Sequence, residues 1–255
     1  MGFSKTFTAV AWLAVALTLA LGGVSPGRAR AADLLTGFGG EAGFGTGVLD
    51  YNDDGSSAAV DISVAFPKGL EFFGQRFRER YVNTNGSISF GGPVGTYTPQ
   101  AFPVAQQRMV AAFWGDVDTR GAGRPARNGI YWDVRPGQVT ITWHNVGYYN
   151  SHNDKLNSFQ IVLRGGQMDD DGVWSCEIRY NQLQWTTGDA SGGGHGLGGT
   201  PAQAGFDAGN NVDFLMLPGS RTRRILNLVR TSNVGQPGIW QFNTRRGAPT
   251  AAPAP

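Results

Sequence analysis

Residues 79–90, ERYVNTNGSISF, carry the clearest structural signal in the chain. Asn85-Gly86 is a strong signal for a two-residue hairpin turn, because both central residues of a type I′ turn need positive φ. Residues typical of strands flank this turn on both sides, so the segment predicts a β-hairpin. Asn85-Gly86-Ser87 is also a glycosylation sequon, although the turn is the main reason for an Asn here.

Apolar and polar residues alternate outward from this hairpin. In residues 139–143, VTITW, Val139, Ile141 and Trp143 share one face, and residues 159–163, FQIVL, show the same period. A period of two is typical of half-buried strands. Frequent Gly between short strands, with no sustained helical period, predicts an all-β, mainly antiparallel β-sandwich with Gly-rich loops and at most one or two short helices. We expect a helical turn at residues 103–109 and a flexible surface loop at residues 186–205.

The first 31 residues are typical of a signal peptide. Lys5 precedes an uncharged apolar run, and residues 29–31, ARA, form an A-x-A cleavage site, so we expect cleavage near Ala31 and a secreted product. An uncleaved membrane anchor is the alternative, but the apolar run is short and Gly and Pro interrupt it. Removal of three basic residues and no acidic one lowers the formal net charge from +2 to −1.

The mature chain is expected to form one domain over residues 32–245, followed by a disordered Pro/Ala-rich tail or linker at residues 246–255. We expect no membrane span in the mature chain, and no basic stripe with interleaved aromatic residues indicates a nucleic-acid partner. Cys176 is the only cysteine, so an intramolecular disulfide is excluded. It alternates with polar residues in residues 174–180, which predicts an inert, inward-facing thiol. Few Lys against many Arg, with abundant Ala and Gly, suggest a bacterial source.

Residues 50–61, DYNDDGSSAAVD, resemble a calcium-binding loop of the EF-hand type, with oxygen donors at alternate positions. A pair of acids in residues 113–119, FWGDVDT, lies on one side of a predicted strand and is also consistent with a cation. The calcium candidates are therefore Asp50, Asn52, Asp54, Asp116 and Asp118. No helix precedes residues 50–61 and a strand-like segment follows, which favours a loop whose Asp and Asn cap their own backbone. Its acids could still meet the second pair in space. No other cofactor is predicted.

Known catalytic motifs are not matched. Residues 188–193, GDASGG, differ from the serine-protease GDSGG by an inserted Ala, and residues 194–199, GHGLGG, match a dinucleotide fingerprint that lacks its helix. The three His have no zinc-ligand spacing. These observations predict a protein that is not an enzyme.

Several segments, taken in order, resemble a nidogen-like (NIDO) domain of the single-module secreted bacterial type. They are NDDGSS (52–57), the hairpin above with its flanks, FWGDVDT (113–119), GIYWDV (129–134), VTITWHNVGYYN (139–150) and AGFDAGN (204–210). The matching order extends over about residues 50–243. The resemblance implies an extracellular, mainly β adhesion or interaction module without catalysis, whose partner is a protein or glycan on a cell surface or in a matrix. The absence of Cys-rich EGF-like repeats places collagen or laminin partners in doubt.

Two alternatives to an adhesion module stay open. One is a carbohydrate-binding or carbohydrate-processing β-sandwich, in which exposed rings stack on sugars. Its candidates are Tyr97, Tyr131, Tyr148 and Tyr149. The other is a calcium-stabilised structural surface protein. The sequence does not identify the ligand or the oligomeric state.

Overall fold

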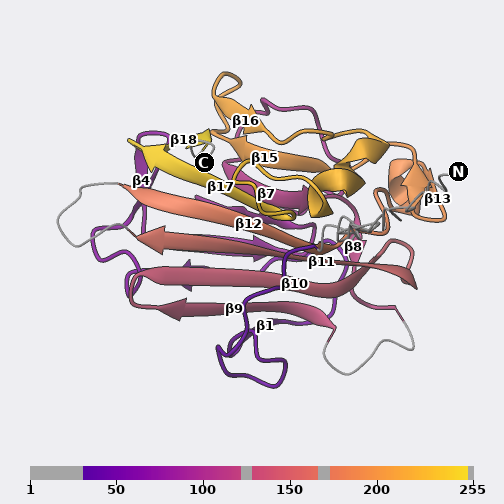
Figure 1. The fold of residues 1–255 in the computed structure, drawn as a ribbon, viewed down its shortest axis with the longest axis horizontal. Helices are drawn as coiled ribbons and strands as arrows, with labels where there is room; N and C mark the ends of the chain where they lie inside the picture. Colours follow the sequence, from indigo (N-terminus) through magenta and orange to yellow (C-terminus); the bar gives the residue numbers. More distant parts are fainter. Residues whose placement is uncertain (1–30, 122–127, 166–172, 252–255) are drawn as a thin grey trace, which may run out of the picture.

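A computed structural model describes residues 31–121, 128–165 and 173–251. Two antiparallel sheets pack face to face and share one hydrophobic core (Figure 1). This arrangement confirms the predicted all-β sandwich. Apart from Ala31, the predicted signal peptide lies outside the described residues.

The larger sheet is built around a meander of long strands. Its order is β1 (Gly47–Leu49), β9 (Gly129–Arg135), β10 (Gln138–Tyr148), β11 (His152–Gly165), β12 (Trp174–Gln182), β17 (Ile239–Arg245) and β18 (Ala248–Ala251), and β8 (Val117–Asp118) also pairs with β10. The predicted parity holds in β10, where Val139, Ile141 and Trp143 all lie in the core. The opposite face is also covered, because the side chain of Gln160 donates to and accepts from the backbone of Leu35, at 3.0 Å each.

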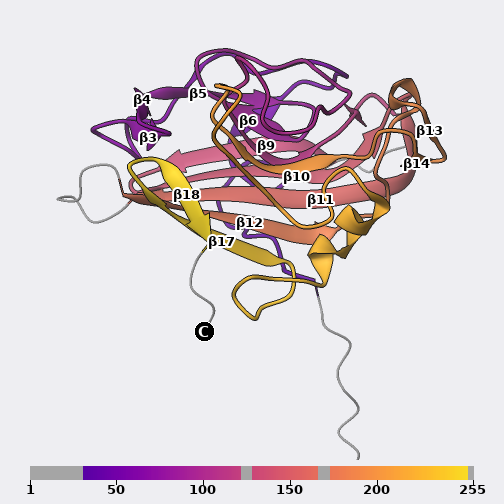
Figure 2. The ribbon, with the colours of Figure 1, turned by 90° about the horizontal axis from the view of Figure 1, so that it is seen from above.

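The smaller sheet has the order β16 (Phe214–Met216), β15 (Gln203–Asp207), β7 (Met109–Trp114), β6 (Ser87–Ser89), β5 (Glu79–Asn83) and β2 (Val60–Asp61). Figure 2 shows β5 and β6 in a layer above the larger sheet. All six residues of β7 are buried, because one face meets the core and the other meets a second apolar cluster. Two short hairpins, β3 (Leu70–Phe72) with β4 (Gln75–Phe77) and β13 (Gly193–Gly194) with β14 (Leu197–Gly198), stand apart from both sheets. The helical segments described are the 3₁₀ turns η1 (Asp189–Ser191) and η2 (Arg223–Val229).

Hydrogen bonds and aromatic contacts join the two layers. The Tyr180 hydroxyl on β12 donates to the Ala112 carbonyl on β7 at 2.7 Å, and the Trp143 indole donates to the Thr84 carbonyl at 3.1 Å. Trp143 also stacks on Phe159, with ring centroids 5.2 Å apart. Cys176 is fully buried, as predicted, and burial raises the pKa of its thiol. The packing therefore fixes the β5–β6 turn against the larger sheet.

The β5–β6 hairpin is present, but its turn is not the predicted two-residue type I′. Asn83 pairs with Ser87, which leaves a three-residue loop in which only Gly86 has positive φ, +77°. A Cβ on Gly86 would lie 1.9 Å from the Phe113 carbonyl oxygen, so this position needs glycine. Asn85 is 1% exposed and both ends of its amide are hydrogen-bonded, so the folded domain does not present the sequon for glycosylation.

Three local predictions were wrong because long-range contacts determine these segments. Residues 103–109 form no helical turn, since Ala105 instead bridges to Asn210 of a distant loop. Residues 186–205 are an ordered element with η1, the β13–β14 hairpin and the start of β15. Residues 248–251, expected in a disordered tail, pair with β17 as strand β18.

Candidate functional site

Four chain segments meet at the end of the sandwich where β8 and β13 lie in Figure 1. They are the acidic loop (residues 50–57), the β5–β6 turn, residues 115–120 around β8, and residues 186–192 around η1. The backbone of Tyr149 links two of these segments. Its amide donates to the Asp116 carbonyl at 3.1 Å, and its carbonyl accepts from the Asp189 amide at 2.8 Å. This end of the molecule contains most of the residues that the sequence marked as candidates.

The acidic loop is an Asx turn and not an EF-hand loop. The Asn52 side-chain oxygen accepts from the Gly55 amide at 2.7 Å and from the Thr84 hydroxyl, and its amide nitrogen donates to the Asp50 carbonyl at 2.6 Å. Asp61 lies in β2 and accepts from the Ser63 amide at 2.7 Å. The predicted self-capping of the backbone is therefore confirmed for Asn52. The EF-hand interpretation is wrong, because the Asn52 side chain is bound to the turn and Asp61 belongs to a strand.

Neutral hydrogen bonds anchor this loop to its neighbours. The Asn52 backbone amide donates to the Thr119 hydroxyl at 2.9 Å. The Asn52 carbonyl accepts from the Thr119 hydroxyl at 2.9 Å and from the Thr119 amide at 3.0 Å. The Asn85 amide donates to Asp54 at 2.8 Å, while its oxygen accepts from the Val117 amide at 2.9 Å. One buried Asn thus joins the acidic loop to β8, which carries Asp118 and directly follows Asp116.

Three carboxylates converge between these segments. Asp53, Asp54 and Asp116 each offer an oxygen that lies within 4.8 Å of one from each of the others. Asp116 is 2% exposed, and its Oδ2 has no hydrogen-bond partner among the described residues. Asp53 Oδ1 is likewise buried without a described partner. Buried polar atoms in proteins are nearly always satisfied, so these two oxygens are unusual.

The electrostatics of the cluster reflect burial and like charge. Burial, followed by the negative charges of Asp53 and Asp54 and of two further acids, raises the pKa of Asp116 to about 7. Burial and the charges of Asp54 and Asp118 raise the pKa of Asp53 to about 6, although Arg120 opposes this shift. Burial and like charge therefore dominate at Asp116, and at Asp53 they outweigh the hydrogen bond and positive charge of Arg120.

Asp118 lies beside the cluster and is paired with Arg120. Arg120 donates to its two oxygens at 2.9 and 2.7 Å and also to Asp53 Oδ2 at 2.9 Å. The Ser151 amide adds a bond of 2.8 Å. Burial opposes the ionisation of Asp118, but the hydrogen bonds from Arg120 and Ser151 outweigh it and lower the pKa of this carboxyl.

The sequence candidates thus separate into two groups. The structure brings Asp54 and Asp116 together, as the sequence allowed, whereas Asn52 and Asp118 are committed to other partners and Asp50 is exposed. Asp53 was missed because the EF-hand template selects alternate residues. The run of adjacent acids at residues 53–54 was the signal that could have identified it.

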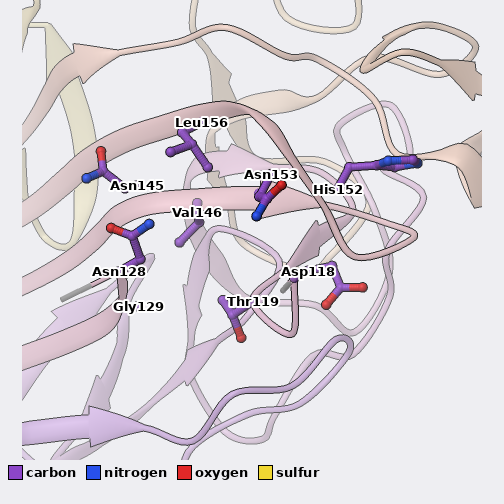
Figure 3. A pocket seen from close by; sticks show the side chains of 11 residues that line it. Asp118, Thr119, Asn128, Gly129, Asn145, Val146, His152, Asn153 and Leu156 are labelled. Atoms are coloured by element: carbon purple, nitrogen blue, oxygen red, sulfur yellow. The ribbon is translucent and has the colours of Figure 1, made fainter. Parts of the chain in front are cut away.

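A pocket is lined in part by Asp118, the acid beside this cluster (Figure 3). Asp118 and His152 stand at one end and Asn128 and Asn145 at the other. It encloses about 250 Å³ when space open to solvent is included, below the roughly 300–1,000 Å³ that is typical of small-molecule sites.

The resemblances to catalytic motifs have no matching geometry. The hydroxyl of Ser191, in the protease-like segment, is hydrogen-bonded to the Thr98 hydroxyl at 2.8 Å. His152 lies 2.8 Å from Asp189 and stacks on Tyr148.

The aromatic candidates for sugar stacking are mostly unavailable. Tyr131 and Tyr148 are buried, Tyr149 is half-buried and Tyr97 is 39% exposed. The predicted set of four rings is therefore wrong as a stacking platform.

Comparison with known proteins places these features in a family. The model of the nidogen-like domain matches residues 78–135 and 131–246. This chain belongs to the nidogen-like domain family. It is 40% identical to chicken (Gallus gallus) alpha-tectorin over 220 residues, which cover 74% of this chain and 10% of that protein. It is 28% identical to Drosophila melanogaster nidogen over 215 residues, 74% of this chain and 15% of the relative.

Mouse (Mus musculus) nidogen-2 is 29% identical over 235 residues, 78% of this chain and 16% of the relative. The nidogen-like chain thus spans only a small part, 10% to 18%, of the curated relatives named here and others like them. No solved structure matches it. These relatives are animal proteins, so a bacterial source stays a prediction. Within the described ranges, no helix has the length and apolar character needed to cross a membrane.

Proposed function

We propose that this chain is an extracellular interaction module without catalytic activity, which binds a protein or glycan on a cell surface or in a matrix. The family match carries the proposal: it includes most strands of both sheets, from β5 to β17. The relatives include alpha-tectorin and nidogens, in which the matching region is a small part of a long protein.

The local chemistry is consistent with a binding role. The described pocket is small, and the serine in the protease-like segment is hydrogen-bonded to a threonine. Asp116 and Asp118 are buried, and Asp118 is paired with Arg120, so these two acids are not arranged on either side of a sugar, as a glycosidase would need.

Two measurements test this proposal. Expression of the full chain, followed by cell fractionation and N-terminal sequencing, should give an exported protein that begins at Ala32. Cytoplasmic protein that retains residues 1–31 would contradict the extracellular assignment. The purified exported chain should then bind immobilised cell-surface or matrix material in a saturable way, whereas the same chain unfolded in urea should not bind.

A glycan array distinguishes the two classes of partner. Binding to matrix material that resists deglycosylation, with no signal on the array, assigns a protein partner. Defined array hits assign a glycan partner. An exported and folded chain that binds neither material contradicts the proposed function.

A further inference from the structure

We propose that Asp53, Asp54 and Asp116 bind one divalent cation, calcium, at the end of the sandwich. This inference concerns the stability of the domain and does not rest on the proposed function. Its ligand set differs from the sequence candidates, since Asp53 enters it and Asp50, Asn52 and Asp118 leave it.

The geometry fits a single ion. Calcium is held by oxygen atoms at roughly 2.3–2.6 Å, so two ligands of one ion lie at most about 5 Å apart. The three carboxylates offer oxygens within 4.8 Å of one another. Two of them come from the acidic loop and one from the segment before β8, so the ion would join parts of the chain that are distant in sequence.

The second observation is the unsatisfied state of the buried oxygens. Asp116 is 2% exposed, and its Oδ2 has no described partner, as is true of Asp53 Oδ1. A carboxylate buried without a donor is strongly unfavourable unless it takes up a proton or pairs with a cation. A Cβ on Gly188 would lie 2.5 Å from Asp116 Oδ2, so residue 188 lies close to this oxygen and leaves no room for a side chain of its own there.

The surroundings hold the carboxylates in place and leave a negative excess. Asn85 fixes Asp54, and Arg120 fixes Asp53 through its other oxygen, Oδ2. Asp118 and Asp189 add negative charge to the field at Asp116. Among the described residues, Arg120 is the cation that pairs with these acids. Its single positive charge is smaller than the summed negative charge of the carboxylates, so a metal ion would bind at a net negative site.

The donor set selects the type of ion. All three donors are carboxylate oxygens, which suit calcium or magnesium rather than zinc, because zinc prefers nitrogen and sulfur ligands. Magnesium needs a nearly ideal octahedron, whereas calcium tolerates irregular geometry. Asp54 is exposed, so water can reach the site and complete the coordination shell.

The test is titration of the full chain, freed of metal with EDTA, by calorimetry and thermal unfolding. Calcium should bind at one site per chain and, at a hundredfold excess over Kd, raise Tm by about 5–10 °C. Asp116→Asn should weaken calcium binding by roughly tenfold or more, because it removes one ligand charge. The variant should fold, since it also removes a repelled carboxylate, and its Tm in EDTA should equal or exceed that of the wild type.

Asp50→Asn is the matched control, because it removes the same charge from an exposed residue of the same loop. It should leave calcium binding within about twofold of the wild type. The inference is overturned if millimolar calcium gives neither heat nor a change in Tm. It is also overturned if Asp116→Asn binds calcium like the wild type, or if Asp50→Asn is the variant that loses binding.

Discussion

Arg80 on β5 provides a sharp test of how this core is assembled. Its side chain is fully buried, and Nε, Nη1 and Nη2 have no hydrogen-bond partner among the described residues. Residues two apart on a strand share a face, so Arg80 points to the same side as Val82, which lies in the core between the sheets. We predict that Arg80→Met stabilises the protein, because a flexible apolar side chain fills similar space without a buried charge.

The magnitude follows from the cost of burying the guanidinium. Burial lowers the pKa of Arg80 to about 9 from an ordinary value of 12.5, a penalty of at most about 5 kcal/mol at roughly 1.4 kcal/mol per unit. Replacing buried ionic groups with apolar ones stabilises proteins by up to about 1–4 kcal/mol. We therefore expect the free energy of unfolding to rise by about 1–4 kcal/mol, with Tm rising about 2–4 °C for each kcal/mol in a domain of this size.

Urea unfolding of the wild type, Arg80→Met and Arg78→Met measures this effect. Arg78 is exposed and lies just before β5, so its substitution should change the free energy of unfolding by less than about 0.5 kcal/mol. The pH dependence adds a second readout. The folded-state pKa of Arg80 is depressed, so the wild type gains stability as pH rises through about 9, and the advantage of Arg80→Met should narrow between pH 7 and pH 10.

A loss of stability in Arg80→Met would refute this reasoning. It would mean that the guanidinium has an acceptor in the folded protein, since breaking a buried ion pair destabilises proteins by roughly 3–5 kcal/mol. If the stability advantage of Arg80→Met over the wild type stays constant up to pH 10, the buried charge is refuted as its cause. Better apolar packing would then be its explanation.

Three further predictions address other parts of the molecule. Burial would raise the pKa of Glu177, but hydrogen bonds from neighbouring Arg and Gln side chains outweigh it and lower this pKa. The ionised carboxylate therefore stabilises the folded state above pH 4.5, and this contribution is lost as pH falls through the folded-state pKa. Glu177→Gln should lower the free energy of unfolding by about 1–3 kcal/mol at pH 7, and urea titrations should show this difference shrinking below pH 4.5. Gly188→Ala should displace Asp116 and weaken calcium binding in calorimetry, while Gly194→Ala, whose Cβ meets nothing within 4 Å, should not. Trp143→Ala should lower the free energy of unfolding by about 3–5 kcal/mol in urea through the cavity it leaves, and a loss below 1 kcal/mol would contradict the central position of this ring.

The strands could be predicted where apolar and polar residues alternate with a period of two. The alternation in β10 and β12 placed Trp143 and Cys176 in the core correctly, because side-chain direction along a strand is a local property. The same reasoning does not predict which side chains of β7 face the core, because both faces of this strand are buried and its residues do not alternate. The outer face of β7 packs against apolar side chains of residues 94–104. No pattern in the sequence predicts that packing.

Local reasoning failed where distant partners decide the backbone. The Asn85-Gly86 signal predicted the hairpin but not its three-residue loop, since the Asn85 side chain is recruited by Asp54 and by the Val117 amide. Residues 186–205 look like a flexible Gly-rich loop by composition. They are ordered because Thr186 and Thr187 are buried and donate to carbonyls within the β13–β14 hairpin.

The acidic cluster shows why a linear template identifies the wrong ligands in the right region. A continuous calcium loop needs ligand oxygens that are free to bind the ion. Here the Asn52 side chain is hydrogen-bonded within the turn, and this turn brings Asp53 and Asp54 toward Asp116. Because neutral hydrogen bonds from Asn52 and Asn85 set this geometry, the three carboxylates are assembled before any ion arrives. A cation would then relieve repulsion in a preformed site, so its removal should lower stability without unfolding the domain.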